Sequence, residues 1–149
     1  MRAVSWSIVV AGPAIEAEQL WHDRSRWASW VNGFGHLQRI DDDWPQPGAR
    51  RMWVTKPGFS GPLRGLIAET VREQRAGQGH TIAIEDERVG GTQRVTFAGD
   101  ATRTRVTVTL ELEPKTRMPP GRRWWLRRQL RQHLERTLTR FSYELAAER

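Results

Sequence analysis

The chain has 149 residues, no cysteine and a formal net charge of +7. This length fits one domain with a real core, and the lack of cysteine excludes disulfides, thiol catalysis and cysteine-based zinc sites. No apolar run is long enough for a membrane span, and Ser5 and Ser7 interrupt the apolar run that a signal peptide would need. We therefore expect a single domain over residues 1–149 and a cytoplasmic location.

The N-terminal third predicts one strand followed by two short helices. Apolar and polar residues alternate over Val4–Ala11, which is typical of a strand. Pro13 then occupies a favourable first position for a helix. A second short helix should run from about Ser25 to Val31, because Trp27 and Trp30 are three residues apart and so share one face.

Six further strands are expected between residues 35 and 113, separated by segments rich in turn-forming residues. The clearest is the last, where Val106 to Leu112 alternate apolar and polar residues. In the strand from residue 63 to 73, either the set beginning at Leu66 or the set beginning at Ile67 points inward. We expect a hairpin turn at Gly90-Gly91. The six predicted strands cover residues 35–40, 49–56, 63–73, 80–86, 92–98 and 103–113.

The segment from Pro119 to Arg149 predicts one long amphipathic helix, roughly 40 Å in length at 1.5 Å per residue. Its apolar residues recur at spacings of three and four and need a partner surface, which the strands supply. Short connections imply antiparallel neighbours. The predicted fold is therefore α+β: a curved, seven-stranded antiparallel sheet wrapped around a long C-terminal helix, with two short helices after the first strand.

Three stretches resemble the START/Bet v 1-like (SRPBCC) superfamily, and most of all its polyketide cyclase/dehydrase branch. They are residues 8–30 with their Leu20-Trp21 pair and Trp27-Ala28-Ser29-Trp30, the hairpin of residues 91–97 and 104–110, and the closing helix. The resemblance implies a helix-grip fold with a cavity between sheet and final helix that receives a hydrophobic or amphipathic small molecule. It implies no catalytic motif common to the superfamily, and we expect no cofactor.

Several aromatic, apolar and polar residues are candidates for contact with such a ligand. Trp44 and Phe59 belong to loops that rim the cavity mouth in this fold. One of Trp124 and Trp125 should be buried, while the other caps the mouth or forms an interface. Glu69, if it points inward, needs a partner such as Arg94. The candidate ligand-binding residues are Trp44, Trp53, Phe59, Glu69, Ile82, Ile84, Phe97, Trp125, Gln129 and His133.

The four histidines lack the spacing of a zinc site, so we expect no metal. The preferred function is binding of a small hydrophobic or aromatic molecule. One alternative is a polyketide cyclase, aromatase or dehydratase, for which the sequence identifies no catalytic residue. The other is a basic module that docks on an anionic protein, RNA or a membrane surface. Nucleic acid is disfavoured, because only two of the 24 basic residues are lysine, and such a bias more often reflects genomic base composition. The sequence leaves open whether the chain forms a homodimer.

Overall fold

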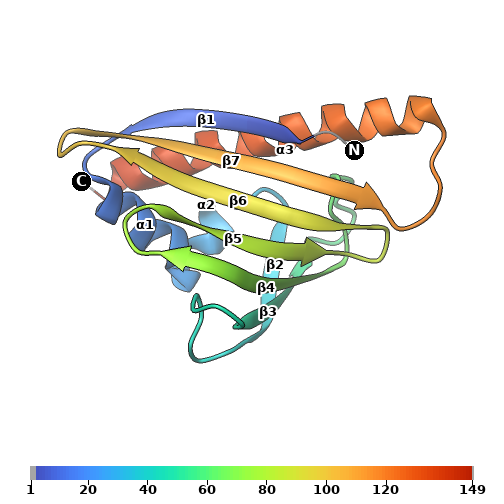
Figure 1. Cartoon of the computed structure of the whole chain (residues 1–149), viewed down its shortest axis with the longest axis horizontal. Helices are drawn as coiled ribbons and strands as arrows, with labels where there is room; N and C mark the ends of the chain where they lie inside the picture. Colours follow the sequence, from blue (N-terminus) through green and yellow to red (C-terminus); the bar gives the residue numbers. More distant parts are fainter. Residues whose placement is uncertain (1–2, 149) are drawn as a thin grey trace.

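The computed structural model describes residues 3–148, which form seven strands and three α-helices in an α+β arrangement (Figure 1). The predicted fold class is confirmed. The elements in chain order are β1 (Val4–Ala11), α1 (Ala14–His22), the 3₁₀ turn η1 (Arg24–Arg26), α2 (Trp27–Trp30), β2 (Phe34–Ile40), β3 (Arg50–Thr55), β4 (Leu66–Arg75), β5 (Gly79–Glu85), β6 (Val89–Gly99), β7 (Arg103–Pro114) and α3 (Pro120–Ala147).

All seven strands belong to one antiparallel sheet with the order β1-β7-β6-β5-β4-β3-β2. Strands β2 to β7 each pair with their neighbours in sequence, as short connections require. Strand β1 instead pairs with β7, with Val4 opposite Leu110 and Ala11 opposite Arg103. Register shifts interrupt the β2–β3 and β4–β5 ladders, and bulges of this kind bend strands. Figure 1 shows α3 crossing one face of the sheet beside β1 and β7.

Helix α3 buries the apolar stripe that its sequence predicts. The stripe is buried, as are the inward residues of β7 from Val106 to Leu112, which are at most 2% exposed, and α3 makes its closest approach to the sheet at β1. None of the helices formed by residues 3–148 is long and apolar enough to span a membrane. The buried stripe consists of Leu126, Leu130, Leu134, Leu138, Phe141 and Leu145.

Three local predictions need correction. The second short helix is split into η1 and a single turn of α2. Gly90 and Gly91 lie inside β6, and the turn before it is closed by Asp86, whose Oδ1 accepts the N–H groups of Arg88 at 2.7 Å and Val89 at 2.9 Å. Strand β4 begins at residue 66, so residues 56–65 form a loop, called here the 56–65 loop.

The strand faces left open by the sequence are now assigned. In β4 the residues Ile67, Glu69 and Val71 are buried, whereas Leu66 is exposed. In β3 it is Trp53 that is buried, flanked by partly exposed neighbours. The inward face of β3 and β4 therefore carries both a large aromatic ring and a carboxyl group.

Candidate functional site

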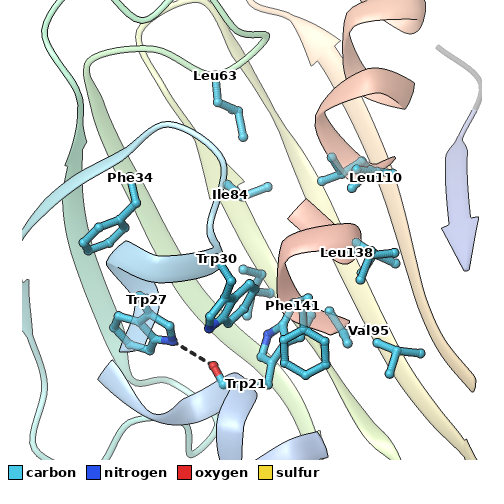
Figure 2. Close-up of a cluster of buried hydrophobic side chains, with 14 of the residues drawn as sticks. Trp21, Trp27, Trp30, Phe34, Leu63, Ile84, Val95, Leu110, Leu138 and Phe141 are labelled. Atoms are coloured by element: carbon cyan, nitrogen blue, oxygen red, sulfur yellow. Dashed lines mark hydrogen bonds between the residues drawn. The ribbon is translucent and has the colours of Figure 1, made fainter. Parts of the chain in front are cut away.

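Aromatic rings fill most of the space between the sheet and α3. Trp21 of α1 and Trp30 of α2 lie 4.6 Å apart between ring centroids, and Phe141 of α3 lies 5.1 Å from the first and 5.0 Å from the second. Trp27 donates its indole N–H to the carbonyl oxygen of Trp21 at 2.7 Å (Figure 2). On the sheet side Phe34 stacks on Trp53 with centroids 5.3 Å apart, outside this first group. The short helices thus dock through their tryptophans.

A small cavity of about 40 Å³ remains in this interior. One water molecule needs roughly 10–15 Å³ by the same kind of measure, whereas ligand sites usually span about 300–1,000 Å³. The cavity is therefore narrower than the hollow that the superfamily resemblance predicts. Its lining comes from α1, α2, the five strands β3 to β7, the 56–65 loop and α3: Trp21, Trp27, Trp30, Val31, Arg51, Trp53, Leu63, Glu69, Ile84, Gln93, Val108, His133, Leu134 and Thr137.

A buried ion pair forms one wall of the cavity. Glu69 Oε1 accepts hydrogen bonds from Arg51, whose Nη2 lies 2.7 Å away and Nε 2.9 Å away. Glu69 Oε2 accepts the indole N–H of Trp53 at 2.6 Å. The carboxylate is only 3% exposed, so these three donors replace its lost hydration.

Two tryptophan rings enclose the Arg51 guanidinium. Its carbon Cζ lies 4.1 Å from the ring centroid of Trp27 and 4.6 Å from that of Trp44. A cation over an indole face is attracted by the electron-rich ring, most strongly when water is excluded. Arg51 therefore contacts two indole rings in addition to its hydrogen bonds with Glu69.

His133 of α3 forms a second polar wall, and its protonation state follows from its neighbours. Arg140 can only donate, so the atom of Asn32 that it contacts at 3.4 Å is the amide oxygen. The amide nitrogen of Asn32 then donates to His133 Nδ1 at 3.1 Å, which leaves the ring proton on Nε2. Burial, and after it the positive charges of Arg136 and Arg140, lowers the pKa of His133 to about 4. The ring is neutral at pH 7.

The indole N–H of Trp30 is buried and has no hydrogen-bond partner within residues 3–148. Trp30 lines the cavity and is itself 2% exposed. A buried donor without an acceptor costs roughly 1–3 kcal/mol. This N–H is an obvious place for an acceptor from outside the chain.

A second pair of histidines lies beside the tryptophan cluster. The rings of His22 and His80 are 4.8 Å apart between centroids, and His80 is also 6.3 Å from Trp21. Burial, and after it the charge of Arg51, lowers the pKa of His22 to about 4. Burial, then His22 and Arg51, lowers the pKa of His80 well below its usual value. Neither histidine lines the cavity.

The 56–65 loop contributes Leu63 to the lining of the cavity. The Phe59 ring packs directly over Gly33 and Gly61, where a Cβ atom would collide with it. An outer depression of about 140 Å³ lies between this loop and α3. His133 lines both the depression and the inner cavity. A path between the two would therefore pass His133.

The structure sorts the ten predicted ligand residues by position. Trp53, Glu69, Ile84 and His133 line the cavity, whereas Phe59 and Gln129 line the outer depression. Trp44 stacks behind Arg51, and Ile82 and Phe97 are buried in the core away from the cavity lining. Trp125 is 53% exposed.

Two of these expectations were wrong in detail. Neither Trp124 nor Trp125 is buried, because the first turns of α3 lie outside the core. Glu69 does point inward, but its partner is Arg51, which lies directly opposite it in the β3–β4 ladder. Arg94 is exposed on β6.

Ten of the fourteen residues that line the cavity were not among the predicted ligand residues, and four of them show why. Arg51 precedes Trp53 by two residues and so shares its face of β3. Thr137 follows His133 by four residues, the spacing of neighbours on a helix. Trp30 was assigned to core packing alone, and Gln93 carried no signal. The spacing of Arg51 from Trp53 and that of Thr137 from His133 would have identified both residues once the inward faces of β3 and α3 were known.

No three histidine, aspartate or glutamate side chains within residues 3–148 gather as a metal site would require. The cavity instead offers neutral and charged donors beside aromatic faces. Such a lining can orient an oxygen atom on a ring-containing molecule.

Comparison with known proteins shows the fold. No family model and no curated protein sequence matches the chain. A conserved protein from Geobacillus kaustophilus superposes with a TM-score of 0.76 at 14% identity, covering 98% of this chain and 96% of that one. A START superfamily protein from Mycobacterium smegmatis gives 0.70 at 18% identity, with 96% and 98% covered.

A protein from the steffimycin biosynthetic pathway is among the similar structures. The di-domain ARO/CYC StfQ from the steffimycin biosynthetic pathway gives a TM-score of 0.72 at 14% identity, over 98% of this chain and 51% of StfQ. The order of elements, the sheet topology and these superpositions agree. The chain therefore has the helix-grip fold of the START/Bet v 1-like (SRPBCC) superfamily.

Proposed function

We propose that the chain binds one small hydrophobic or aromatic molecule between its sheet and α3. The observation that carries this proposal is a small cavity lined by Trp30, whose buried indole N–H has no hydrogen-bond partner among residues 3–148. An oxygen acceptor on the ligand would take this N–H, while the neighbouring indole faces would hold an aromatic ring.

The polar groups of the cavity support the proposal because they do not help the fold. Replacing a buried ion pair by apolar residues of similar size is often neutral or stabilising, by about 1–4 kcal/mol. The chain nevertheless keeps Arg51 and Glu69 at the cavity wall, close to a buried donor without an acceptor. Local departures from stability rules of this kind cluster at functional sites.

The size of the cavity restricts how a ligand would enter. A space of about 40 Å³ holds a few water molecules, so a ring-containing ligand needs side chains to move. The 56–65 loop is the segment best placed to do so, because the half-buried Phe59 ring fills the space beside the outer depression. We expect Phe59 to act as the gate.

The test is native mass spectrometry of freshly purified protein, followed by thermal unfolding with a panel of phenols, flavonoids and fatty acids. A binder should raise the melting temperature in a concentration-dependent way. Trp30→Phe keeps a smaller aromatic ring and removes the donor, so it should weaken binding by roughly tenfold, equal to the loss of one buried hydrogen bond. Trp124→Phe, on the exposed part of α3, is the matched control and should bind like the native chain.

A Phe59→Ala variant tests the gate separately. It should speed both association and dissociation in stopped-flow tryptophan fluorescence, with little change in affinity. Absence of any co-purified molecule together with no thermal stabilisation across the panel would overturn the binding proposal. Equal affinity for the native chain and Trp30→Phe would overturn the role of the indole N–H.

A second candidate function is a cyclase, aromatase or dehydratase reaction on a polyketide-like substrate. The supporting observation is that Glu69, Arg51 and His133 reach the wall of one cavity. Both oxygens of Glu69 and the Nδ1 of His133 already accept hydrogen bonds, so the group that the neutral His133 offers a substrate carbonyl oxygen is its Nε2–H donor. Turnover of a poly-β-ketone analogue that is lost in His133→Gln would favour the enzyme; tight binding without turnover would favour the binder.

A further inference from the structure

The start of α3 forms a projecting, exposed tip, here called the α3 tip and defined as residues 119–125. Every residue of the tip is exposed. Trp124 and Trp125 are 61% and 53% exposed, although tryptophan is among the most buried side chains on average. Figure 1 shows the first turns of α3 reaching past the start of β1, where the sheet no longer covers them.

The α3 tip lies in the most basic part of the chain. Residues 114–134 contain seven lysine or arginine residues and no aspartate or glutamate. Arg128 lies over both tip tryptophans, with its Cζ 5.7 Å and 5.9 Å from their ring centroids. At the other end of α3 the charge is neutralised, because Arg26 pairs with Glu144 and Glu148. The surplus positive charge is thus concentrated beside the exposed indoles.

Helix stability does not explain this arrangement. The N-terminus of a helix carries a partial positive charge and favours carboxylates in its first turn. Helix α3 has no acidic residue there and no side-chain cap, and Arg122 and Arg123 occupy the turn instead. The cations are therefore placed where the helix itself disfavours them, and an anionic surface would relieve the cost.

The indole rings and the arginine side chains together indicate which kind of partner would bind the α3 tip. A second copy of the chain meeting this patch across a two-fold axis would bring two sets of arginines together, which is repulsive. Tryptophan prefers the boundary between lipid headgroups and acyl chains, and arginine binds anionic headgroups from the same depth. A convex tip suits a soft, planar surface.

We propose that the α3 tip docks on an anionic lipid bilayer, with Trp124 and Trp125 inserted at the headgroup level and the surrounding arginines bound to lipid phosphates. This inference rests on the surface charge and exposed indoles and is independent of the ligand cavity. The bound protein stays at the interface, since α3 is held to the sheet by its buried leucines.

The test is flotation of the full chain with vesicles of phosphatidylcholine alone and of equal phosphatidylcholine and phosphatidylglycerol, at low and high salt. The native chain should float with the anionic vesicles at low salt and lose most binding at high salt. Replacing Trp124 and Trp125 by alanine should weaken partition about tenfold. Replacing Arg122, Arg123 and Arg128 by glutamine should weaken it roughly a hundredfold.

The matched control is the triple variant R72Q/R103Q/R105Q, which removes three exposed arginines from the strands and has the same net charge. It should retain at least a third of native partition. Equal losses in the two triple variants would overturn the proposal, because binding would then reflect overall charge. Binding of a single-stranded RNA oligonucleotide, or of an acidic protein, without binding to anionic vesicles would also overturn it.

Discussion

Arg51 and Glu69 lie directly opposite each other on β3 and β4. Their side chains form an ion pair on the inward face of the sheet, with 2.7 Å between Nη2 and Oε1. Removing one partner leaves a buried charge, which usually costs about 3–5 kcal/mol. We therefore expect Glu69→Gln to lower the free energy of unfolding by that amount in urea titrations. The double variant R51M/E69Q should recover at least half of the loss.

An exposed ion pair provides the comparison. Arg75 and Glu73 are 3.4 Å apart and largely solvated, so Arg75→Ala should cost at most about 1 kcal/mol. A cost at Glu69→Gln no larger than at Arg75→Ala would contradict the assignment of a dry ion pair.

Stability should fall as the pH decreases from 7.5 to 5. The pKa of His133 is about 4 in the folded chain against about 6.5 when unfolded, so the unfolded chain binds more protons between these values. The contribution of His133 to stability is intact above pH 6.5 and shrinks by about 2 kcal/mol at pH 5. Chemical denaturation at several pH values measures this slope.

His133→Gln should have a shallower pH dependence than the native chain. His36 is exposed on β2, and His36→Gln serves as the control with a native slope. Identical slopes for all three proteins would show that His133 does not titrate with folding.

The buried tryptophans should dominate the stability of the helical layer. Trp27 and Trp30 are at most 2% exposed, so each alanine substitution should cost about 3–5 kcal/mol. Trp125→Ala removes a ring that is 53% exposed and should change the free energy of unfolding by less than about 1 kcal/mol. A large loss at Trp125 would mean that the α3 tip packs against the domain.

Gly91 is required by the close approach of two strands. A Cβ atom there would collide with the carbonyl oxygen of Glu111 on β7, so Gly91→Ala must push β6 and β7 apart. We expect a loss of roughly 1–3 kcal/mol in thermal or urea unfolding. Gly121 of α3 has open space around it, and Gly121→Ala should be neutral or stabilising by up to about 1 kcal/mol. A larger loss of stability in Gly121→Ala than in Gly91→Ala would refute this account of the packing.

The fold was predictable where one pattern allowed one structure. The alternation in β7 and the spacing of leucines in α3 each have a single low-energy solution, and both predictions are confirmed. The hairpin turn predicted at Gly90-Gly91 was wrong. Paired glycines usually mark a turn, but these two lie inside β6. Position 91 needs a glycine because the carbonyl oxygen of Glu111 lies too close for a Cβ atom. This proximity becomes known only when β6 is paired with β7.

The site was harder to predict because it depends on register. Both faces of β4 carry apolar residues, so periodicity did not decide whether Glu69 points inward. Its partner depends on which β3 residue lies opposite, and that follows from loop lengths and bulges. Trp125 was misplaced because helix periodicity says which residues share a face, but not where the sheet beneath them ends.

The pairing of β1 with β7 has a consequence for how the chain folds. Val4 and Leu110 are neighbours in the sheet although most of the sequence separates them. During synthesis the first strand must wait, unpaired, until nearly all later residues exist, and contacts of such long range slow folding. Closure of this outer pair and docking of α3 should be the last cooperative event, so an incomplete chain exposes an apolar edge that invites aggregation.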